Sequence, residues 1–312
     1  MANHQELRNR IHGPCVCLPI LFADDLSVDH DAMARYAVWI RDAGIAVTCM
    51  THGYSQQGYV TAEENLQITQ TYASVFGDET VFLAATLGEL WDIQPTIEKL
   101  HDTGCHGVFI LPPAAASQDG DAYTRFVCAT AERCDVPLFV YSYGNPLQPG
   151  TPMLPMACYE RLIEHDNFVG LKEDVNSAPY RLQLIQRFGD RLAMIGGGTM
   201  RIYLQVHQYP CQSELEGFFA PRRSLQIARL LDENQHREAL RIVEHWETKR
   251  RECHGDLFFI AVNQVIMYAM GFARTWKLRP PMVTATDEQA QRIIKFVEQH
   301  PDMFERPEKS AG

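Results

Sequence analysis

The sequence predicts a (β/α)8 barrel followed by a helical extension, and three observations support this fold class. Eight short apolar segments alternate with amphipathic segments over about 220 residues, which is typical of parallel strands joined by crossover helices. The first strand ends without the glycine-rich turn that an open dinucleotide-binding sheet needs. After residue 221 the apolar spacing becomes purely helical. We therefore expect a barrel over residues 1–221 and a helical domain over residues 222–312.

The eight expected strands are short apolar runs, each followed by a stretch with helical spacing. We place them at residues 15–22, 45–51, 81–86, 107–111, 136–141, 168–172, 192–195 and 214–219. Asp29 supplies an acidic N-cap for a helix that extends to Ala43, and Thr61 with Glu64 forms the capping box of the next helix. Four helices are expected after the barrel, at residues 224–232, 235–250, 256–270 and 287–299.

Charge and hydropathy exclude two classes of protein. The 312 residues include 28 basic and 39 acidic side chains, which give a formal net charge of −11. A protein that binds nucleic acid or anionic membranes needs a basic binding face instead. No apolar run approaches the roughly 18–20 residues that span a bilayer. The polar N-terminus also lacks the apolar region of a secretory signal. We expect no nucleic-acid partner and no membrane partner.

The cysteines indicate a reducing compartment. There are nine, an odd number, scattered through apolar segments, which fits buried reduced thiols better than a disulfide framework. Cys15 and Cys17 share one face of a predicted strand, but they lack the second pair of ligands that a zinc site needs. The sequence also lacks a nucleotide-binding fingerprint. We therefore expect a cytoplasmic protein without a metal or cofactor.

Lys172 stands out among the basic residues. Only six of the 28 are lysines, and Lys172 is the one that ends an apolar barrel strand, at the end of the barrel where active sites lie. Partial desolvation there should lower its pKa, so that the neutral amine can attack a carbonyl group and form a Schiff base. The alternative is a structural lysine that pairs with Glu173 or Asp174.

Strand alternation places possible partners around this lysine. Gly170, Lys172 and Asp174 share one face of their strand, while Glu173 points toward the helices. Tyr141 ends the neighbouring strand, and its hydroxyl beside the amine would suit proton transfer during Schiff-base formation. We predict that Lys172 and Tyr141 are catalytic and that Asp174 contacts the substrate.

Two further strand ends supply candidate substrate-binding residues. After the second strand come His52, Gly53, Tyr54 and Ser55, where a histidine that titrates near neutrality suits acid–base chemistry. A strand-end histidine bonded to a backbone carbonyl is the alternative. Residues 196–198 are glycines after the seventh strand, and Gly197 and Gly198 would let a ligand approach the backbone. A plain flexible turn explains these glycines equally well.

Four segments of the chain carry a family pattern. They are residues 19–29, the strand 136–141 that ends in Tyr141, the strand 168–173 that contains Lys172, and residues 278–282. Together they resemble the dihydrodipicolinate synthase/N-acetylneuraminate lyase superfamily of Schiff-base lyases. The order and spacing of these segments follow the family pattern from about residue 12 to residue 300. The resemblance implies a barrel with a helical C-terminal domain, a homo-oligomer (dimer or tetramer), and metal-independent chemistry on pyruvate or another 2-oxo acid.

The chain departs from the family pattern where substrates are recognised. The family's Gly-Thr-Thr-Gly-Glu motif is replaced by His-Gly-Tyr-Ser-Gln over residues 52–56, so both threonine hydroxyls are lost and Ser55 replaces at most one of them. The tyrosine pair after the fourth strand is Ala-Ala at residues 114–115, and the arginine for aspartate semialdehyde falls at Pro146. These changes argue against dihydrodipicolinate synthesis. The run at residues 54–57 is similar to a Tyr-Ser-Glu-Gln pattern of a sugar-acid dehydratase branch.

Two classes of function remain open. In the first, Lys172 forms a Schiff base with pyruvate or a 2-keto-3-deoxy sugar acid, and the enzyme is an aldolase or a dehydratase. In the second, a non-catalytic barrel binds a 2-oxo acid or a sugar acid. Lys172 and Tyr141 favour the first, because binding alone does not need a Schiff base.

Overall fold

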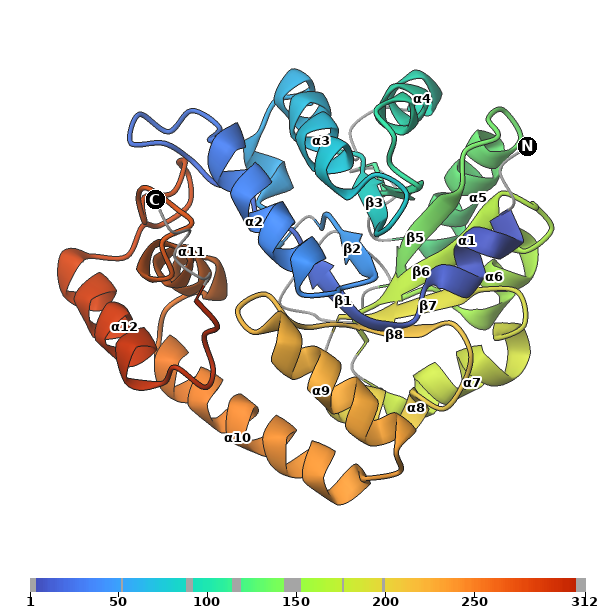
Figure 1. Cartoon of the computed structure of the whole chain (residues 1–312). Coiled ribbons are helices and arrows are strands. Elements are labelled where there is room, and N and C mark those ends of the chain that lie inside the picture. Colours follow the sequence, from blue (N-terminus) through green and yellow to red (C-terminus); the bar gives the residue numbers. More distant parts are fainter. Residues whose placement is uncertain are drawn as a thin grey trace.

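The computed structural model describes residues 4–51, 53–87, 92–113, 119–142, 153–175, 177–197 and 200–306. Within these ranges eight parallel strands close into one barrel, in chain order from β1 to β8 and back to β1 (Figure 1). Helices surround the strands, and more helices follow at the C-terminal side. The predicted (β/α)8 barrel with a helical extension is confirmed.

Every residue of the eight strands is buried, because one face lines the barrel interior and the other faces the helices. The strands are β1 (Gly13–Cys17), β2 (Val47–Cys49), β3 (Val81–Ala85), β4 (Gly107–Ile110), β5 (Leu138–Ser142), β6 (Phe168–Glu173), β7 (Ala193–Gly196) and β8 (Gln212–Leu215). The first seven overlap their predicted ranges, and β1 ends well before residue 22.

The predicted range of the last strand is wrong. The sequence pattern placed it at residues 214–219, but β8 ends at Leu215 and Gly217 has a positive φ of 96°, which takes the chain out of the sheet. Phe218 is buried instead by stacking on Tyr54, with ring centroids 4.6 Å apart. The apolar residues Phe218 and Phe219, which are buried by aromatic packing, therefore resembled strand residues in the sequence pattern.

The helices follow the predicted order, with one addition at the N-terminus. They are α1 (His4–Arg10), α2 (His30–Asp42), α3 (Ala62–Phe76), α4 (Gln94–Asp102), α5 (Gly120–Ala131), α6 (Met156–Leu162), α7 (Ala178–Phe188), α8 (Met200–Val206), α9 (Pro221–Asp232), α10 (His236–His254), α11 (Phe259–Ala269) and α12 (Asp287–Gln299), with a 3₁₀ turn at Gln57–Tyr59. Both predicted caps are confirmed, because the Asp29 side chain accepts a hydrogen bond from the Ala32 amide, and Thr61 and Glu64 form a capping box.

The core has an inner and an outer layer. Inside the barrel, Phe109, Phe139 and Ile195 pack together with Leu7 and Ile11, which come from α1 and the residue after it. The unpredicted N-terminal helix therefore packs against the barrel interior. Outside the barrel, the other face of the strands packs against the surrounding helices. Both layers hold the carboxyl ends of the strands in fixed positions.

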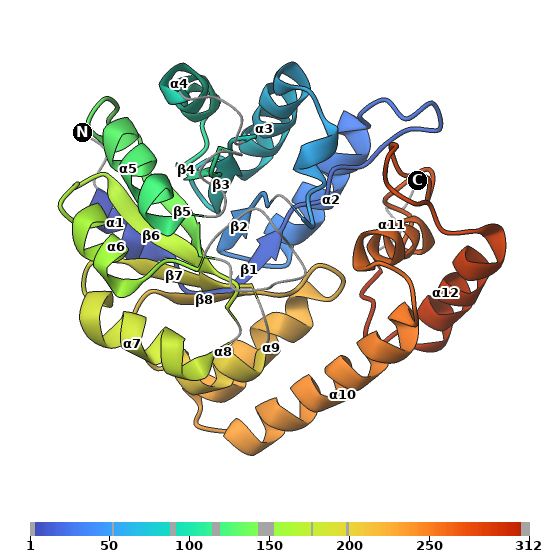
Figure 2. The same ribbon diagram turned by 180° about the vertical axis from the view of Figure 1, so that it is seen from behind.

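The C-terminal helices lie at one side of the barrel (Figures 1 and 2). Phe272, after α11, packs against Tyr36 and Trp39 of α2, with ring centroids 5.1 and 5.0 Å apart. Farther along, Arg279 forms a bidentate ion pair with Glu64 of α3, at 2.8 and 2.9 Å. The chain after α9 is thus fixed to the β2 side of the barrel. A domain boundary at residue 221 stays a prediction. No helix in the described ranges is long and apolar enough to cross a membrane.

Candidate active site

Lys172 and Tyr141 lie side by side inside the barrel. They are register partners on β6 and β5, and the Lys172 ammonium lies 5.1 Å from the centroid of the Tyr141 ring. Both side chains are almost completely buried, with 5% and 4% of their surface exposed. A closed parallel barrel places its reactive groups at these strand ends. The alternation predicted for β6 therefore brings the two residues together.

Asp174 pairs with this lysine and is only partly satisfied. Its Oδ2 atom forms an ion pair with the Lys172 ammonium, while its buried Oδ1 atom has no hydrogen-bond partner among the described residues. The predicted alternative of a lysine paired with a neighbouring carboxylate is therefore present in this geometry. An acceptor left open beside an amine can also receive a proton or a ligand hydroxyl.

Gly197 borders the Lys172–Asp174 pair. A Cβ atom at this position would collide with the Asp174 carboxylate and would lie 2.6 Å from the Lys172 ammonium. The Gly197 amide also donates a hydrogen bond to the carbonyl of Glu173, at 2.9 Å. A glycine is therefore required here by close approach to the lysine, which a flexible turn alone would not demand. Gly198 and His52 lie outside the described residues.

The Tyr141 phenol keeps its proton and has a backbone partner. Its hydroxyl donates a hydrogen bond of 3.4 Å to the carbonyl of Met50, at the end of β2. Burial raises the pKa of Tyr141 well above its usual value, and the nearby Cys49, Cys17 and Asp174 add to the rise. A neutral phenol next to an amine can donate a proton to a departing hydroxyl group.

A thiol and two hydroxyl groups form a cluster below the β2 loop, which we call the Cys17 cluster. The Cys17 thiol lies 3.0 Å from the Thr51 hydroxyl and 3.3 Å from the Ser55 hydroxyl, and the Thr51 amide donates to the Ser55 hydroxyl at 2.8 Å. All three side chains are buried. Burial raises the pKa of Cys17, which stays a thiol. Ser55 thus lies within a buried polar chain.

Sequence reasoning missed Cys17 and Thr51 as members of this site. Cys17, Cys49 and Thr51 all lie on the inner side of β1 and β2, where Cys17 and Cys49 are register partners. Thr51 follows Cys49 by two residues, so strand alternation could have found it. The contact with Ser55 depends on the path of the loop, which the sequence does not show.

Gly53 and Tyr54 are held by aromatic side chains from distant segments. The Tyr54 ring stacks on Phe218, with an interplanar angle of 14°, and contacts Phe259 of α11 at 4.9 Å between ring centroids. A Cβ atom at Gly53 would lie 3.6 Å from the Phe259 ring. Burial raises the pKa of Tyr54 to about 12. Gly53 and Tyr54 therefore lie between the barrel and the C-terminal helices.

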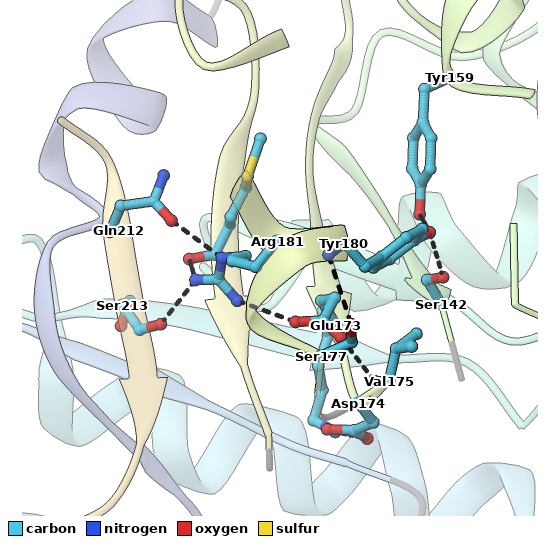
Figure 3. A network of polar contacts seen from close by, with 12 residues as sticks. Ser142, Tyr159, Glu173, Asp174, Val175, Ser177, Tyr180, Arg181, Gln212 and Ser213 are labelled. Carbon is cyan, nitrogen blue, oxygen red and sulfur yellow. Dashed lines mark hydrogen bonds and ion pairs between the residues drawn. The ribbon is translucent and has the colours of Figure 1, made fainter. Parts of the chain in front are cut away.

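Glu173 points outward, as strand alternation predicts, into a network outside the barrel (Figure 3). Arg181 of α7 is fully buried and donates to the Gln212 side chain at 2.9 Å, to the Met194 carbonyl at 2.9 Å and to Glu173 at 3.4 Å. Burial raises the pKa of Glu173, and Arg181 opposes that rise. This network ties β6, β7 and β8 to α7 behind the Lys172 site.

Metal ligation has no candidate in the part of the chain that the structure describes. No group of three or more His, Cys, Asp or Glu side chains there is arranged to hold a metal ion. The expected chemistry without a metal or cofactor stays a prediction. The acid–base groups present are Asp174, Tyr141 and the Cys17 cluster.

Comparison with known sequences identifies relatives along most of the chain. The model of the dihydrodipicolinate synthetase family matches residues 21–300. An uncharacterized DapA-like lyase of Pyrococcus abyssi is 24% identical over 293 residues, which cover 91% of this chain and 96% of that protein. A probable 5-dehydro-4-deoxyglucarate dehydratase of Corynebacterium glutamicum is 24% identical over 194 residues, which cover 62% of this chain and 60% of the dehydratase. The match to this dehydratase thus spans less than two thirds of its length.

Comparison with solved structures identifies the same fold. Dihydrodipicolinate synthase from Aquifex aeolicus superposes with a TM-score of 0.81 at 15% identity, over 95% of this chain and 100% of that one. N-acetylneuraminate lyase from Fusobacterium nucleatum superposes with a TM-score of 0.78 at 14% identity, over 93% and 99% of the two chains. At this level of identity the likeness concerns the fold alone.

Proposed function

Because the chain belongs to the dihydrodipicolinate synthetase family, we propose that it is a lyase in which Lys172 forms a Schiff base with a 2-oxo acid. The observation that carries the proposal is the buried Lys172 ammonium, 5.1 Å from the Tyr141 ring and paired with an incompletely bonded Asp174. A buried lysine between an acid and a carboxylate suits nucleophilic attack on a ketone.

The proposed reaction begins with proton transfer from the Lys172 ammonium to Asp174. The neutral amine then attacks the C2 ketone of the substrate, and the resulting carbinolamine loses its hydroxyl group as water with a proton from the Tyr141 phenol. The iminium ion that remains withdraws electrons from C3. The Tyr141 phenolate left by this step can therefore remove a C3 proton and leave an enamine, while Asp174 keeps the proton that it took from Lys172.

Two outcomes share this enamine chemistry. Loss of hydroxide from C4, with a proton supplied by an acid, gives dehydration, whereas cleavage of the bond between C3 and C4 gives an aldolase. The name of the Corynebacterium relative supports dehydration of a sugar acid. The changed loop at residues 52–56 supports an activity other than dihydrodipicolinate synthesis. We propose pyruvate or a 2-keto-3-deoxy sugar acid as the substrate class.

We also propose that the protein works as a homo-oligomer in the cytoplasm. The nine cysteines are all free, and seven are buried, which supports a reducing compartment such as the cytoplasm. The family resemblance supports a homo-oligomer, either a dimer or a tetramer. Size-exclusion chromatography with light scattering would distinguish these from a monomer.

Borohydride trapping tests the Schiff base directly. The protein is incubated with pyruvate or with a panel of 2-keto-3-deoxy sugar acids, reduced with borohydride, digested and examined by mass spectrometry. The expected result is an adduct on Lys172 and on none of the other five lysines, with no adduct in Lys172→Ala. Absence of an adduct with every acid would instead favour a barrel that only binds such acids. Products of the reactive acids distinguish dehydration from cleavage.

A further inference from the structure

A pocket lies between the carboxyl end of the barrel and the C-terminal helices. It has a volume of about 620 Å³, including space open to solvent. Its apolar wall includes Met200 at the start of α8, Phe219 after β8 and Trp246 of α10. None of the residues assigned above to the Schiff-base chemistry lines it.

Two opposite charges line this pocket without pairing directly. Arg250 of α10 forms no hydrogen bond and no ion pair with the residues that the structure describes, although Glu216 lies close enough for mutual electrostatic influence. The Glu216 carboxylate accepts a hydrogen bond of 3.2 Å from the Gly217 amide. Glu216 is partly exposed and Arg250 is exposed, so solvent reaches both groups, and a ligand between them could replace water and bond to both.

The other charged groups of the pocket are accounted for. Glu247 pairs with Arg201 at 2.6 Å. Burial lowers the pKa of His254 to about 4, with contributions from nearby Arg250 and Arg292, so this imidazole is neutral at pH 7. Arg250 is thus the cation of this pocket that is left for an anionic ligand.

Three connections join the pocket to the Lys172 site. Met200 follows Gly197 by three residues, and Gly197 borders the Lys172 ammonium. Phe219 lines the pocket and also packs against the interior of the barrel. Tyr54 packs against the barrel interior and stacks on Phe218, whose ring centroid lies 6.2 Å from that of Phe219 in the pocket wall. A substrate held at Lys172 could extend past Tyr54 into the pocket.

We propose that Glu216 and Arg250 bind the end of the substrate that is remote from the 2-oxo group. Arg250 binds a distal carboxylate through its planar guanidinium, and Glu216 accepts hydrogen bonds from neighbouring hydroxyl groups. The substrate is then a hydroxylated dicarboxylic 2-oxo acid. This assignment rests on the proposed Schiff base at Lys172, which holds the other end of the molecule.

A matched pair of acids tests the assignment. The first is 2-keto-3-deoxygluconate, and the second is the six-carbon 2-keto-3-deoxy diacid that carries a carboxylate in place of the terminal alcohol. We expect the KM of the wild type to be at least about tenfold lower for the diacid, because an arginine site rejects a ligand that lacks its charged partner. Arg250→Gln should remove this preference, while adduct formation with pyruvate at Lys172 stays unchanged.

Arg251→Gln is the matched control, since Arg251 is the next residue on α10, is exposed like Arg250 and does not line the pocket. It should keep the preference for the diacid. Equal KM values for both acids in the wild type, or equal losses for both acids and for pyruvate in Arg250→Gln, would overturn the assignment.

Calorimetric binding of both acids to Lys172→Ala separates this proposal from the proposed function. A tighter Kd for the diacid that disappears when Arg250→Gln is added supports the distal site, even if borohydride trapping fails with every acid. Successful trapping at Lys172 without any difference in Kd between the two acids would instead support the Schiff base and refute the distal site.

Discussion

Two buried ion pairs occupy successive positions of β6 and differ in how completely they are bonded. Inside the barrel, Lys172 pairs with Asp174, whose Oδ1 atom has no partner in the described ranges. Outside the barrel, Glu173 pairs with Arg181, which also bonds to Gln212 and to two backbone carbonyls. The outer pair and its neighbours satisfy one another, whereas the inner pair keeps bonding capacity for a ligand.

This difference indicates which buried ion pair stabilises the fold and which one takes part in catalysis. A buried charge is tolerated when all its hydrogen bonds are made, and Arg181 meets that condition while it joins three strands to α7. The inner pair leaves the Asp174 Oδ1 atom without a partner among the described residues, and it lies at the end of the barrel where ligands bind. We therefore expect substitutions in the inner pair to affect turnover and substitutions in the outer pair to affect stability.

The largest effect is expected for Lys172→Ala. Turnover of the 2-oxo acid that reacts in the borohydride experiment should fall by roughly 10⁴-fold or more, because no other amine can form the Schiff base there. This is the scale of loss that follows removal of a nucleophile. Steady-state kinetics and circular dichroism measure turnover and folding. A folded variant that retains turnover within tenfold of the wild type would break the comparison, since Lys172 would then be structural.

Arg181→Met should mainly lower the free energy of unfolding, by about 3–5 kcal/mol, because it leaves Glu173 buried without its cation. Urea denaturation measures this change. Burial already raises the pKa of Glu173 and Arg181 opposes the rise, so the variant raises it further. An acid with a raised folded-state pKa loses stability as the pH increases above its unfolded value. The deficit should therefore shrink as the pH falls toward about 4.5.

Arg187→Met is the control for this prediction. Arg187 lies on the same helix and pairs with Glu160, but both side chains are about half exposed, at 49% and 50%. Its loss should change the free energy of unfolding by less than about 1 kcal/mol. Similar losses for the two variants would contradict the structural role of the outer network.

Tyr141→Phe should reduce turnover by about 10²-fold, the lower end of the range for general acid–base catalysis. The phenol is the group that would protonate the departing hydroxyl, while the aromatic ring and its packing remain. Borohydride trapping should still modify Lys172, although more slowly. Tyr159→Phe, which removes a buried hydroxyl outside the barrel, should leave turnover unchanged. Loss of turnover in both variants would indicate a general packing defect.

Sequence alone predicted what depends on the alternation of a strand. Lys172, Tyr141 and the outward direction of Glu173 follow from a period of two and from the chain order of neighbouring strands. The eighth strand was misplaced because Phe218 and Phe219 look like strand residues but are buried by aromatic packing. Local pattern cannot distinguish these two ways of burying a side chain.

Contacts between distant segments could not be predicted from the pattern. Ser55 follows β2 and contacts Cys17 of β1, 38 residues earlier in the sequence. Tyr54 meets Phe218 and Phe259, which are more than 160 residues away in the sequence. Docking of the C-terminal helices against the barrel sets these contacts, and one sequence gives no periodic signal for such docking.

The smallest effect is expected for a third ion pair, which solvent reaches. Glu64 and Arg279 join α3 to the C-terminal segment, with 25% and 19% of their side chains exposed. Glu64→Gln should lower the free energy of unfolding by about 1 kcal/mol at pH 7. Gln keeps the acceptor of the capping box, so the variant mainly removes charge. Glu63→Gln, in the same helical turn, is the control for net charge.

The pH dependence of this third pair sharpens the comparison with β6. The hydrogen-bonded Arg279 lowers the pKa of Glu64 to about 2 from an ordinary value of 4.5. A lowered folded-state pKa contributes stability above the unfolded pKa and loses it as the pH falls toward the folded value. The difference between wild type and Glu64→Gln should therefore diminish below about pH 4.5, in urea denaturation at pH 7, 4.5 and 3.5. A difference that stays constant would mean that hydrogen bonding, and not charge, links α3 to the C-terminal segment. The partly exposed pair would then resemble the Arg181 network outside the barrel, in which hydrogen bonds of the guanidinium stabilise the fold.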